Sequence, residues 1–365
     1  MSTSYSPDQP QQSQSWFGPE TEAALHAVVP NVMPEQSLAL YARWWQLEAW
    51  LRELIYVELR ALHGARWIDE LRAASGRQSQ DGAFSHMSTA DSENPLAYLD
   101  YSQLLPIIDI HWDQLQYALL ERKSWDGRQE ELKRVRHRIG HIRRPHRDDL
   151  ARIEQTLRDL ERGAFIACAS YNRRMAPRSG KFTDPVTTGW IAAEHPTAQR
   201  LIRHAEMQYG VSLDVEVSRR PWATWPNSLE SVKGVLWHVD FFLRDRAVNV
   251  SALWNATRSI RSLIVHLHVS DPHHAGFTFS AADDAKAISD AVGLCFDAVL
   301  HASRRGHGAQ GITDMDDRVL TEWRNRAESI DYRIMSRSGW YIVDESTIPI
   351  SMFGAGGAVE ILPNW

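Results

Sequence analysis

The sequence has few cysteines and no long uncharged apolar run. Cys168 and Cys295 are the two cysteines among 365 residues, too few for a disulfide framework or a CxxC zinc signature. Each lies in an apolar stretch, where we expect a buried, unreactive thiol. A membrane span needs about 18 consecutive apolar residues, and the chain has no such run; its first residues also lack the pattern of a signal peptide. We therefore expect a cytoplasmic protein with no membrane partner.

Lysine is also scarce, so the positive charge is almost entirely arginine. Of 40 Lys and Arg residues 35 are Arg, against 46 acidic residues and a formal net charge of -6. A planar guanidinium binds phosphate through two hydrogen bonds, which makes phosphate contacts plentiful. The chain has no Walker loop, dinucleotide fingerprint or nucleophile elbow, and we expect no cofactor.

The hydrophobic pattern divides the chain into four segments and predicts a multidomain fold. Residues 1–33 begin with a Ser-, Gln- and Pro-rich stretch and are expected to form a largely disordered tail. Residues 34–175 carry apolar residues at helical spacing and predict an all-α bundle. Residues 176–189 contain Pro, Gly, Ser and Thr and are the expected linker. Residues 190–365 mix strand-like and helix-like patterns and predict a mixed α/β (α+β) domain.

Local signals predict the elements of the bundle. The longest helix is expected over 35–63, because no Gly or Pro interrupts it and Gly64 follows. A polar loop is expected over 75–95, a helix break at Pro106 and a turn over 125–127. Two more helices are expected on either side of Pro145: 128–141 and 148–171.

In the C-terminal segment, period-two alternation and apolar runs predict strands at 211–217, 235–243, 263–269 and 340–343. Helices are expected over 280–304, with Ser280 as the N-cap, and over 316–335.

The densest positive charge lies between Lys133 and Arg147. This segment reads KRVRHRIGHIRRPHR and holds seven Lys or Arg residues and three His, with no carboxylate. A concentrated positive field in an acidic chain favours a polyanion as partner. Histidine is also the side chain best suited to proton transfer near neutral pH. The alternative is a solvated helix face, although such faces usually interleave acidic residues.

Along residues 34 to 171 the chain resembles the HEPN domain superfamily. The resemblance rests on ARWWQLEAWLRELIYVELRALHG in the first long helix, YLDYSQLLPII before the middle helix, and RHRIGH leading into RRPHRDDLARIEQTLRDLE. It implies a helical bundle that pairs through the helix carrying the motif, and a metal-independent endoribonuclease activity. Arg136 matches the motif arginine and His141 the catalytic histidine, while His137 takes the polar position where Asn is commoner. Arg134 also fits the spacing and is the second choice.

The spacing alone does not identify the site, since Arg261 and His266 fit it within a predicted strand. Residues five apart on an ideal helix lie about 140° apart around the axis, whereas residues seven apart nearly eclipse. Arg134 therefore shares a face with His141 more easily than Arg136 does, unless the helix loosens near its end or Arg136 serves a partner chain.

RNA cleavage by such a pair needs no metal. His141 would accept the ribose 2′-OH proton and Arg136 would stabilise the phosphorane, leaving a 2′,3′-cyclic phosphate. RNA-backbone contacts are expected from the other basic side chains, with solvated surface as the alternative: Arg134, Arg138, Arg143, Arg144, His146 and Arg147. The resemblance also implies a homodimer through the bundle, a toxin or anti-phage role, and tRNA or mRNA as target. An antitoxin or a phage-derived trigger is the partner considered for the C-terminal domain.

Two other functions remain open from the sequence. One is a non-catalytic HEPN module that binds RNA or scaffolds a complex, with sensing or partner binding in the C-terminal domain. The other places the activity in residues 190–365, at a histidine cluster formed by His266, His268, His273 and His274. Zinc is conceivable there, but Asp271 is the one carboxylate in the pattern, so we expect no metal.

Overall fold

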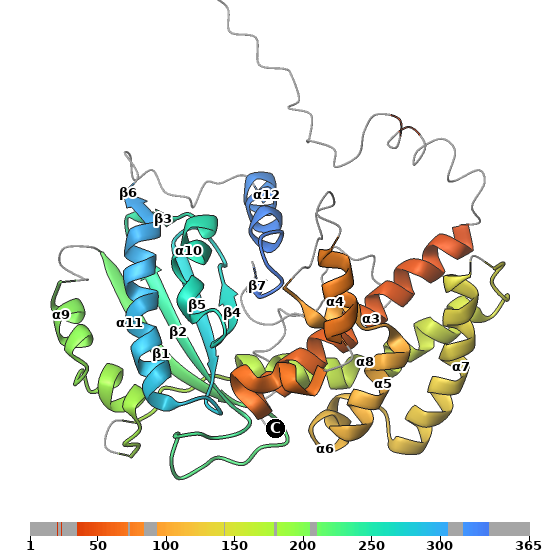
Figure 1. The fold of residues 1–365 in the computed structure, drawn as a ribbon, viewed down its shortest axis with the longest axis horizontal. Helices are drawn as coiled ribbons and strands as arrows, with labels where there is room; N and C mark the ends of the chain where they lie inside the picture. The colour runs from red at the N-terminus through yellow and green to blue at the C-terminus, as the bar shows by residue number, and fades with distance from the viewer. Residues whose placement is uncertain are drawn as a thin grey trace, which may run out of the picture.

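The computed structural model describes residues 35–71, 74–83, 93–141, 143–178, 181–204, 210–305 and 317–335, together with Glu20 and Ala23. In these residues the chain forms a helical part followed by a mixed sheet with its own helices (Figure 1). The strand expected at 340–343 lies outside the described residues. So does the expected disordered tail, residues 1–33, except for Glu20 and Ala23.

The helix α3 (Glu35–His63) has the predicted bounds. Its apolar side chains cover much of its circumference, and Trp50 and Leu54 are completely buried. Gly64 follows with a φ of +60°, a left-handed conformation that ends the helix.

The prediction of a loop over 75–95 is wrong for residues 75–82. The chain forms the 3₁₀ helix η2 (Gly64–Leu71), the helix α4 (Ala74–Gly82) and the 3₁₀ helix η3 (Pro95–Tyr98). The sequence of α4 is polar throughout, so no apolar stripe marks it as a helix. Tertiary contacts hold it instead: the Tyr98 hydroxyl donates to Asp81 at 3.1 Å, and Arg77 donates to the Tyr98 carbonyl at 3.3 Å.

The helix α5 (Tyr101–Ile110) passes through Pro106 without the predicted break. Asp100 and Gln103 form a capping box at its start, and Ile108 is completely buried. These contributions outweigh the one backbone hydrogen bond that Pro106 cannot donate. Two short helices follow: α6 (Trp112–Leu115) and η4 (Gln116–Ala118).

The helix α7 (Arg122–Gly140) begins before the turn expected over 125–127, so that prediction is also wrong. The Glu121 side chain caps its first turn, and Trp125 is buried in the helical core. Pro145 lies in the connection to α8 (Asp149–Asn172), as predicted. In Figure 1, α7 lies at the outer edge of the helical part, away from the sheet.

The second half of the chain contains a five-stranded sheet in the order β1-β2-β5-β4-β7, antiparallel except for the β4–β7 pair. The strands are β1 (Val211–Arg219), β2 (Val235–Leu243), β4 (Ile264–His268), β5 (His274–Ser280) and β7 (Ile334–Met335). The predicted strands β1, β2 and β4 are confirmed. The predicted strands do not include β5, although its sequence HAGFTFS alternates between polar or small residues and apolar ones; both of its faces are buried.

Shorter elements complete this half: η5 (Thr187–Ile191), α9 (Pro196–His204), β3 (Arg246–Val248), α10 (Val250–Ala256), η7 (Arg258–Ile260), α11 (Ala285–Ala302), β6 (Ser303–Arg305) and α12 (Asp317–Glu328). The helix α11 has Asp284 as its N-cap and not Ser280, because Ser280 is the last residue of β5. The helix expected over 316–335 is shorter than predicted, and its last residues belong to β7. Within the stretch expected as a linker, Phe182 and Val186 pack into the core of the sheet.

Helices cover both faces of the sheet (Figure 1). On one face, α10 and α11 enclose the second hydrophobic core. On the other face the end of α3 and the end of α8 meet the strands: the Tyr56 hydroxyl donates to the Val265 carbonyl at 2.6 Å, and the Tyr171 hydroxyl donates to Thr278 Oγ1 at 2.9 Å. Leu236 and Val265 of the sheet belong to the core of the helical part. The helical part and the sheet therefore share a buried interface. No helix among the described residues has the length and apolarity that crossing a membrane requires.

Candidate functional site

The two motif histidines lie together at the exposed end of α7. His137 is in the last turn and His141 is the C-cap residue. Their ring centroids are 4.4 Å apart at an interplanar angle of 67°, and both side chains are exposed. The positive charge of His141 is the main cause that lowers the pKa of His137, with smaller contributions from desolvation, Arg143 and Arg136. His137 therefore loses its proton more readily than an isolated imidazole.

Arg136, the first choice for the motif arginine, forms an ion pair with the carboxylate that caps α5. Its Nη2 atom lies 3.7 Å from Asp100 Oδ2, and the two side chains are 39% and 26% exposed. Burial opposes ionisation of Asp100, but the Ser102 hydroxyl, Arg136 and Arg77 lower its pKa. An ion pair this long and this exposed is worth at most about 1 kcal/mol, so a phosphate can compete for the guanidinium.

Arg134, the second choice, is an exposed residue of α7. Lys133 and, less strongly, Arg134 lower the pKa of Glu130. The two candidate arginines thus have different carboxylate neighbours.

Arg138 joins the end of α7 to the start of α8. Its Nε donates to Asp149 Oδ2 at 2.7 Å, and its Nη2 donates to the other oxygen of the same carboxylate. Asp149 is 4% exposed and also accepts a hydrogen bond of 2.9 Å from the His146 backbone N–H. This bidentate pair occupies two of the donors that were expected to contact phosphate.

The other predicted phosphate ligands lie exposed on the connection between α7 and α8: Arg143, Arg144, His146 and Arg147. The Arg143 N–H donates to the Arg138 carbonyl at 2.9 Å, and the Gln36 amide donates to the Arg147 carbonyl at 3.2 Å. These bonds hold the connection against α7 and α3. We call the surface formed by the helix end and this connection the basic corner; it comprises Arg136, His137, His141, Arg143, Arg144, His146 and Arg147.

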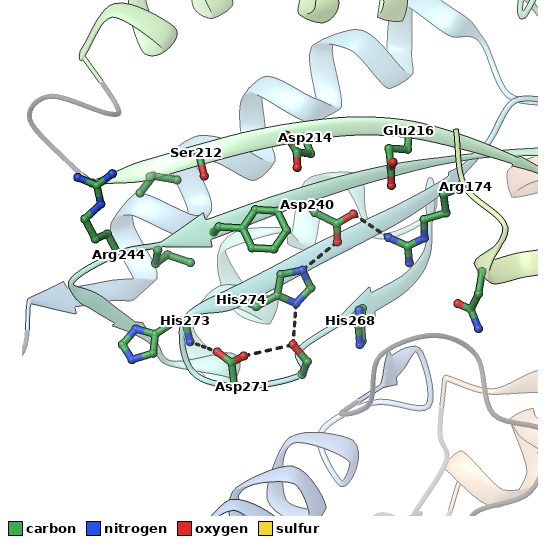
Figure 2. Close-up of a pocket in the computed structure, with 16 residues that line it drawn as sticks. Arg174, Ser212, Asp214, Glu216, Asp240, Arg244, His268, Asp271, His273 and His274 are labelled. Carbon is green, nitrogen blue, oxygen red and sulfur yellow. Dashed lines mark hydrogen bonds and ion pairs between the residues drawn. The ribbon is translucent and has the colours of Figure 1, made fainter. Parts of the chain in front are cut away.

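A second polar site lies on the sheet, where it forms a pocket of about 780 Å³ (Figure 2). Residues two apart in a strand share a face, so alternating side chains of neighbouring strands line it: Asp214 and Glu216 of β1, Asp240 of β2, His274 of β5 and His268 of β4. Arg174 enters from the chain just after α8, where Met175 pairs with Val217 of β1.

Asp240 is the centre of the hydrogen bonds in this pocket. Its Oδ1 lies 2.9 Å from His274 Nε2, and its Oδ2 accepts from Arg174 Nη1 at 2.7 Å (Figure 2). His274 Nδ1 lies 3.1 Å from the Ser270 hydroxyl. Burial opposes ionisation of Asp240, but His274 and Arg174 outweigh it and lower the pKa. Asp240 is therefore a buried carboxylate at neutral pH.

Gly276 makes room for that carboxylate. The strand register places it opposite Asp240 on β2 and opposite His268 on β4. A Cβ atom at Gly276 would lie 2.3 Å from Asp240 Oδ1, closer than two such atoms can approach. The absence of a side chain is thus needed for the pocket and not for the strand itself.

Beyond the pocket, the same sheet face is covered by α8 and carries neutral polar groups. His238 lies 2.7 Å from the Ser218 hydroxyl and 3.2 Å from that of Thr278, and the Tyr171 hydroxyl lies 2.8 Å from His266 Nδ1. Burial and the neighbouring cations lower the pKa of His266 to about 3 and that of His238 well below its usual range. His266 therefore serves the interface with α8 and does not line the pocket.

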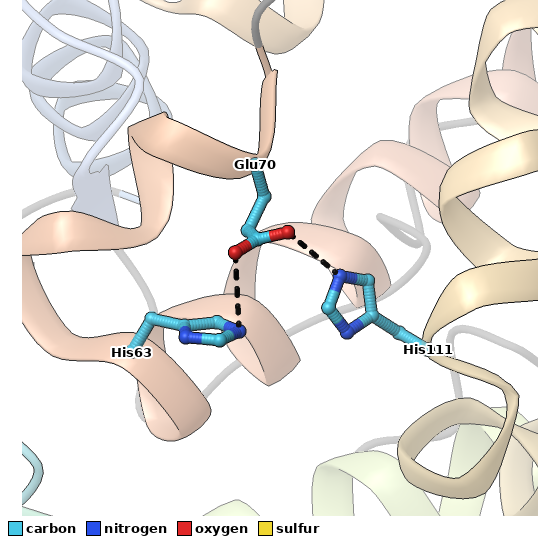
Figure 3. A group of neighbouring side chains, drawn as sticks. All are labelled: His63, Glu70 and His111. Atoms are coloured by element: carbon cyan, nitrogen blue, oxygen red, sulfur yellow. Dashed lines mark ion pairs between the residues drawn. The ribbon is translucent and has the colours of Figure 1, made fainter.

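A third cluster joins α3, η2 and the residue after α5 (Figure 3). Glu70 lies 3.9 Å from His63 Nε2 and 3.5 Å from His111 Nε2. Burial lowers the pKa of both histidines, although Glu70 acts in the opposite direction. The Glu70 side chain is 35% exposed, so this cluster is more open to water than the one around Asp240.

Sequence reasoning found part of the pocket. His268, His273, His274 and Asp271 all line it, although His273 Nδ1 lies 2.6 Å from the Arg246 carbonyl and so serves the backbone. It missed Asp240, Arg174 and Gly276. The signal for Asp240 is the alternation of VLWHVDFFL, which puts His238 and Asp240 on the polar face of an otherwise apolar strand. Comparison of the chain with protein-family models, curated proteins and solved structures gives no significant match.

Proposed function

We propose that this chain is a metal-independent endoribonuclease of the HEPN type, acting at the basic corner. The observation that carries the proposal is the exposed contact between His141 and His137, the residue after Arg136, in a segment without carboxylates. Two imidazoles at one phosphate are what general acid and base catalysis of RNA cleavage requires.

In the proposed reaction His141 removes the proton of the ribose 2′-OH, and the 2′-oxygen attacks the adjacent phosphorus. The bond from phosphorus to the 5′-oxygen breaks, and a second imidazole returns a proton to that leaving oxygen. The products are a 2′,3′-cyclic phosphate and a 5′-hydroxyl. Arg136 stabilises the added negative charge of the phosphorane, for which a fixed cation is suited. DNA lacks the nucleophile and is not cleaved.

The second imidazole comes from His137 or from a partner chain. An isologous homodimer through the helical bundle brings two copies of the basic corner to one cleft, and the position of α7 at the outer edge of the helical part leaves room for it (Figure 1). The cellular targets in this proposal are tRNA or mRNA, the role is that of a toxin or anti-phage effector, and the C-terminal domain receives an antitoxin or a trigger.

The test is cleavage of a mixed-sequence RNA by the full chain in EDTA, with product ends identified. We expect Arg136→Ala and His141→Ala to lose activity by about 100-fold or more, and Arg134→Ala to retain it. Matched controls are Arg200→Ala and His301→Ala, which change exposed residues elsewhere. Full cleavage by both the Arg136 and His141 variants would overturn the assignment, as would loss of cleavage on addition of EDTA.

The alternative is a non-catalytic HEPN module that binds RNA or scaffolds a complex. The exposed arginines of the basic corner favour binding in either case. This alternative predicts salt-dependent RNA binding without any cyclic phosphate product.

A further inference from the structure

We propose that Asp240, His268 and His274 form a binding site for one divalent transition-metal ion, of the kind represented by Zn²⁺. The site lies in the sheet pocket and depends on no residue of the basic corner. It is therefore independent of the proposed ribonuclease activity.

Three possible metal ligands from three different strands lie close together. Asp240 is on β2, His274 on β5 and His268 on β4, and the ligand atoms of all three lie within 4.8 Å of one another. Ligands of a tetrahedral zinc ion, at bond lengths of about 2 Å, are about 3.3 Å apart. Asp240 Oδ1 and His274 Nε2, at 2.9 Å, are already near that spacing, and the proposed site requires the His268 ring to turn toward them.

Two of the three proposed ligands, His274 and Asp240, already have a partner for the atom that would face away from the ion. Ser270 lies beside the far nitrogen of His274 at 3.1 Å, and Arg174 donates to the far oxygen of Asp240 at 2.7 Å. Such outer contacts fix the ring and carboxylate orientations in natural metal sites. The ion would replace only the contact between Asp240 Oδ1 and His274, while the outer contacts remain.

The charged side chains that line the pocket leave it with a surplus of negative charge. Four carboxylates line the pocket, those of Asp214, Glu216, Asp240 and Asp271, against two guanidiniums, those of Arg174 and Arg244. Four negative and two positive charges leave a surplus of two negative charges when the histidines are neutral. A dication neutralises this surplus in a site whose three proposed ligands are each less than a tenth exposed.

The donor set also indicates the class of metal. Two imidazoles and one carboxylate favour Zn²⁺, Fe²⁺ or a related ion over Mg²⁺ and Ca²⁺, which prefer oxygen ligands. Three protein ligands would leave one or more coordination positions open, and all three side chains line the pocket (Figure 2). An open position is typical of catalytic and not of purely structural zinc sites.

The experiment titrates Zn²⁺ alone into full-length protein that has been stripped with EDTA and desalted. We expect one high-affinity ion per chain, much weaker binding of Mg²⁺, and affinity reduced by at least about 100-fold in His274→Ala and Asp240→Asn. His273→Ala is the matched control, since His273 lines the same pocket and bonds to the backbone. It should bind Zn²⁺ as the unchanged protein does.

A measurement on the unchanged chain protects the test against variants that fail to fold. Addition of Zn²⁺ should shift the imidazole NMR resonances of His268 and His274 and leave those of His63 and His111 in place. No Zn²⁺ binding by the unchanged chain, unchanged binding in the Asp240 and His274 variants, or shifts confined to His63 and His111 would each overturn the proposal. None of these outcomes depends on whether the protein cleaves RNA in EDTA. The metal-site proposal and the ribonuclease proposal can therefore each fail independently of the other.

Discussion

The guanidinium of Arg220 and the carboxylate of Glu58 form an ion pair in which the side chains are 0% and 1% exposed. Arg220 Nε donates to Glu58 Oε1 at 2.8 Å, and the Tyr117 hydroxyl donates to the same oxygen at 2.7 Å. The Trp222 indole N–H donates to the other carboxylate oxygen at 2.5 Å. Glu58 belongs to α3 and Arg220 directly follows β1, so this network ties the helical part to the sheet.

Glu58→Gln should therefore destabilise the whole chain. The substitution keeps the shape of the side chain but leaves the Arg220 charge buried without its counter-ion, which costs about 3–5 kcal/mol. Urea unfolding of the full chain measures the loss. Lys286→Ala is the control, because it breaks a solvent-exposed pair with Asp290, and exposed ion pairs contribute little to stability. Losses of equal size for the two variants would contradict the prediction.

His266 should make stability fall in mild acid. Burial, followed by Arg60, His268 and other cations, depresses its folded-state pKa to about 3, against about 6.5 in the unfolded chain. Below about pH 6.5 the unfolded state therefore binds a proton that the folded state refuses, and stability is lost progressively down to about pH 3. At pH 5 the loss from this residue is about 2 kcal/mol.

The check is to compare urea unfolding at about pH 7.5 and about pH 5 for the unchanged chain and for His266→Gln. The variant should lose about 2 kcal/mol less between the two pH values, because glutamine does not titrate. His301→Gln, at an exposed position, should change nothing. A variant with the same pH dependence as the unchanged chain would refute the buried neutral state of His266.

At the basic corner, His141→Ala should raise the pKa of His137. The charge of His141 is the largest cause that lowers this pKa, and alanine removes it. Titration of the imidazole C–H resonances by NMR follows His137 directly. His146→Ala serves as the control, since His146 is not among the groups that lower the His137 pKa. An unchanged or lower pKa in the His141 variant would show that the two rings do not interact in solution.

Substitution of Arg138 should lower the stability of the fold, whereas substitution of the arginines in the connection between α7 and α8 should weaken RNA binding. Arg138→Ala leaves the buried Asp149 carboxylate without its guanidinium partner. We expect this to lower the free energy of unfolding by on the order of 2 kcal/mol. The double change Arg143→Ala and Arg144→Ala should leave unfolding nearly unaffected. It should instead reduce the slope of log affinity against log salt by about 1.4 for single-stranded RNA. A loss of stability in the Arg143 and Arg144 double variant, with a reduced salt slope in the Arg138 variant instead, would contradict the prediction.

The helical part could be predicted from sequence where its cause is local. The bounds of α3 follow from a continuous apolar stripe and a stop glycine, and the basic corner is contiguous in the chain, so its charge can be read directly. The ion pairs made by the arginines at the end of α7 could not be predicted from the sequence. The carboxylate partner of Arg138 is on α8, and that of Arg136 caps α5, so only packing decides which arginines remain available.

The sequence predicts only the part of the pocket that is close together in the chain, from His268 to His274, because strand pairing assembles the rest. Arg174, Asp240, His268 and His274 come from four separate segments of the chain, and β5, which brings His274 and Gly276 into place, is not among the predicted strands. Polar residues occur on this face both in the pocket and where α8 covers it, and sequence patterns do not distinguish a buried polar network from a binding site.

Gly276→Ala tests the pocket through a residue that contributes no ligand. The added methyl group would lie 2.3 Å from Asp240 Oδ1, so the carboxylate must move away from His274. We expect Zn²⁺ affinity to fall by about 10-fold or more, since displacing a group that orients a ligand costs that much in natural sites. Zinc titration of the full-length variant measures the change, and circular dichroism verifies that the sheet is retained.

Gly293→Ala is the matched control for this substitution. Gly293 lies in α11, where a Cβ would be 3.6 Å from the nearest atom of Trp190, an ordinary contact distance, and alanine favours a helix by up to about 1 kcal/mol. This variant should fold and bind Zn²⁺ as the unchanged chain does. If Gly276→Ala folds and keeps full affinity, the position of the Asp240 carboxylate over Gly276 is not needed for Zn²⁺ binding, which would contradict this prediction. Both variants should cleave RNA equally well in EDTA, because neither glycine lies on α7 or its connection to α8.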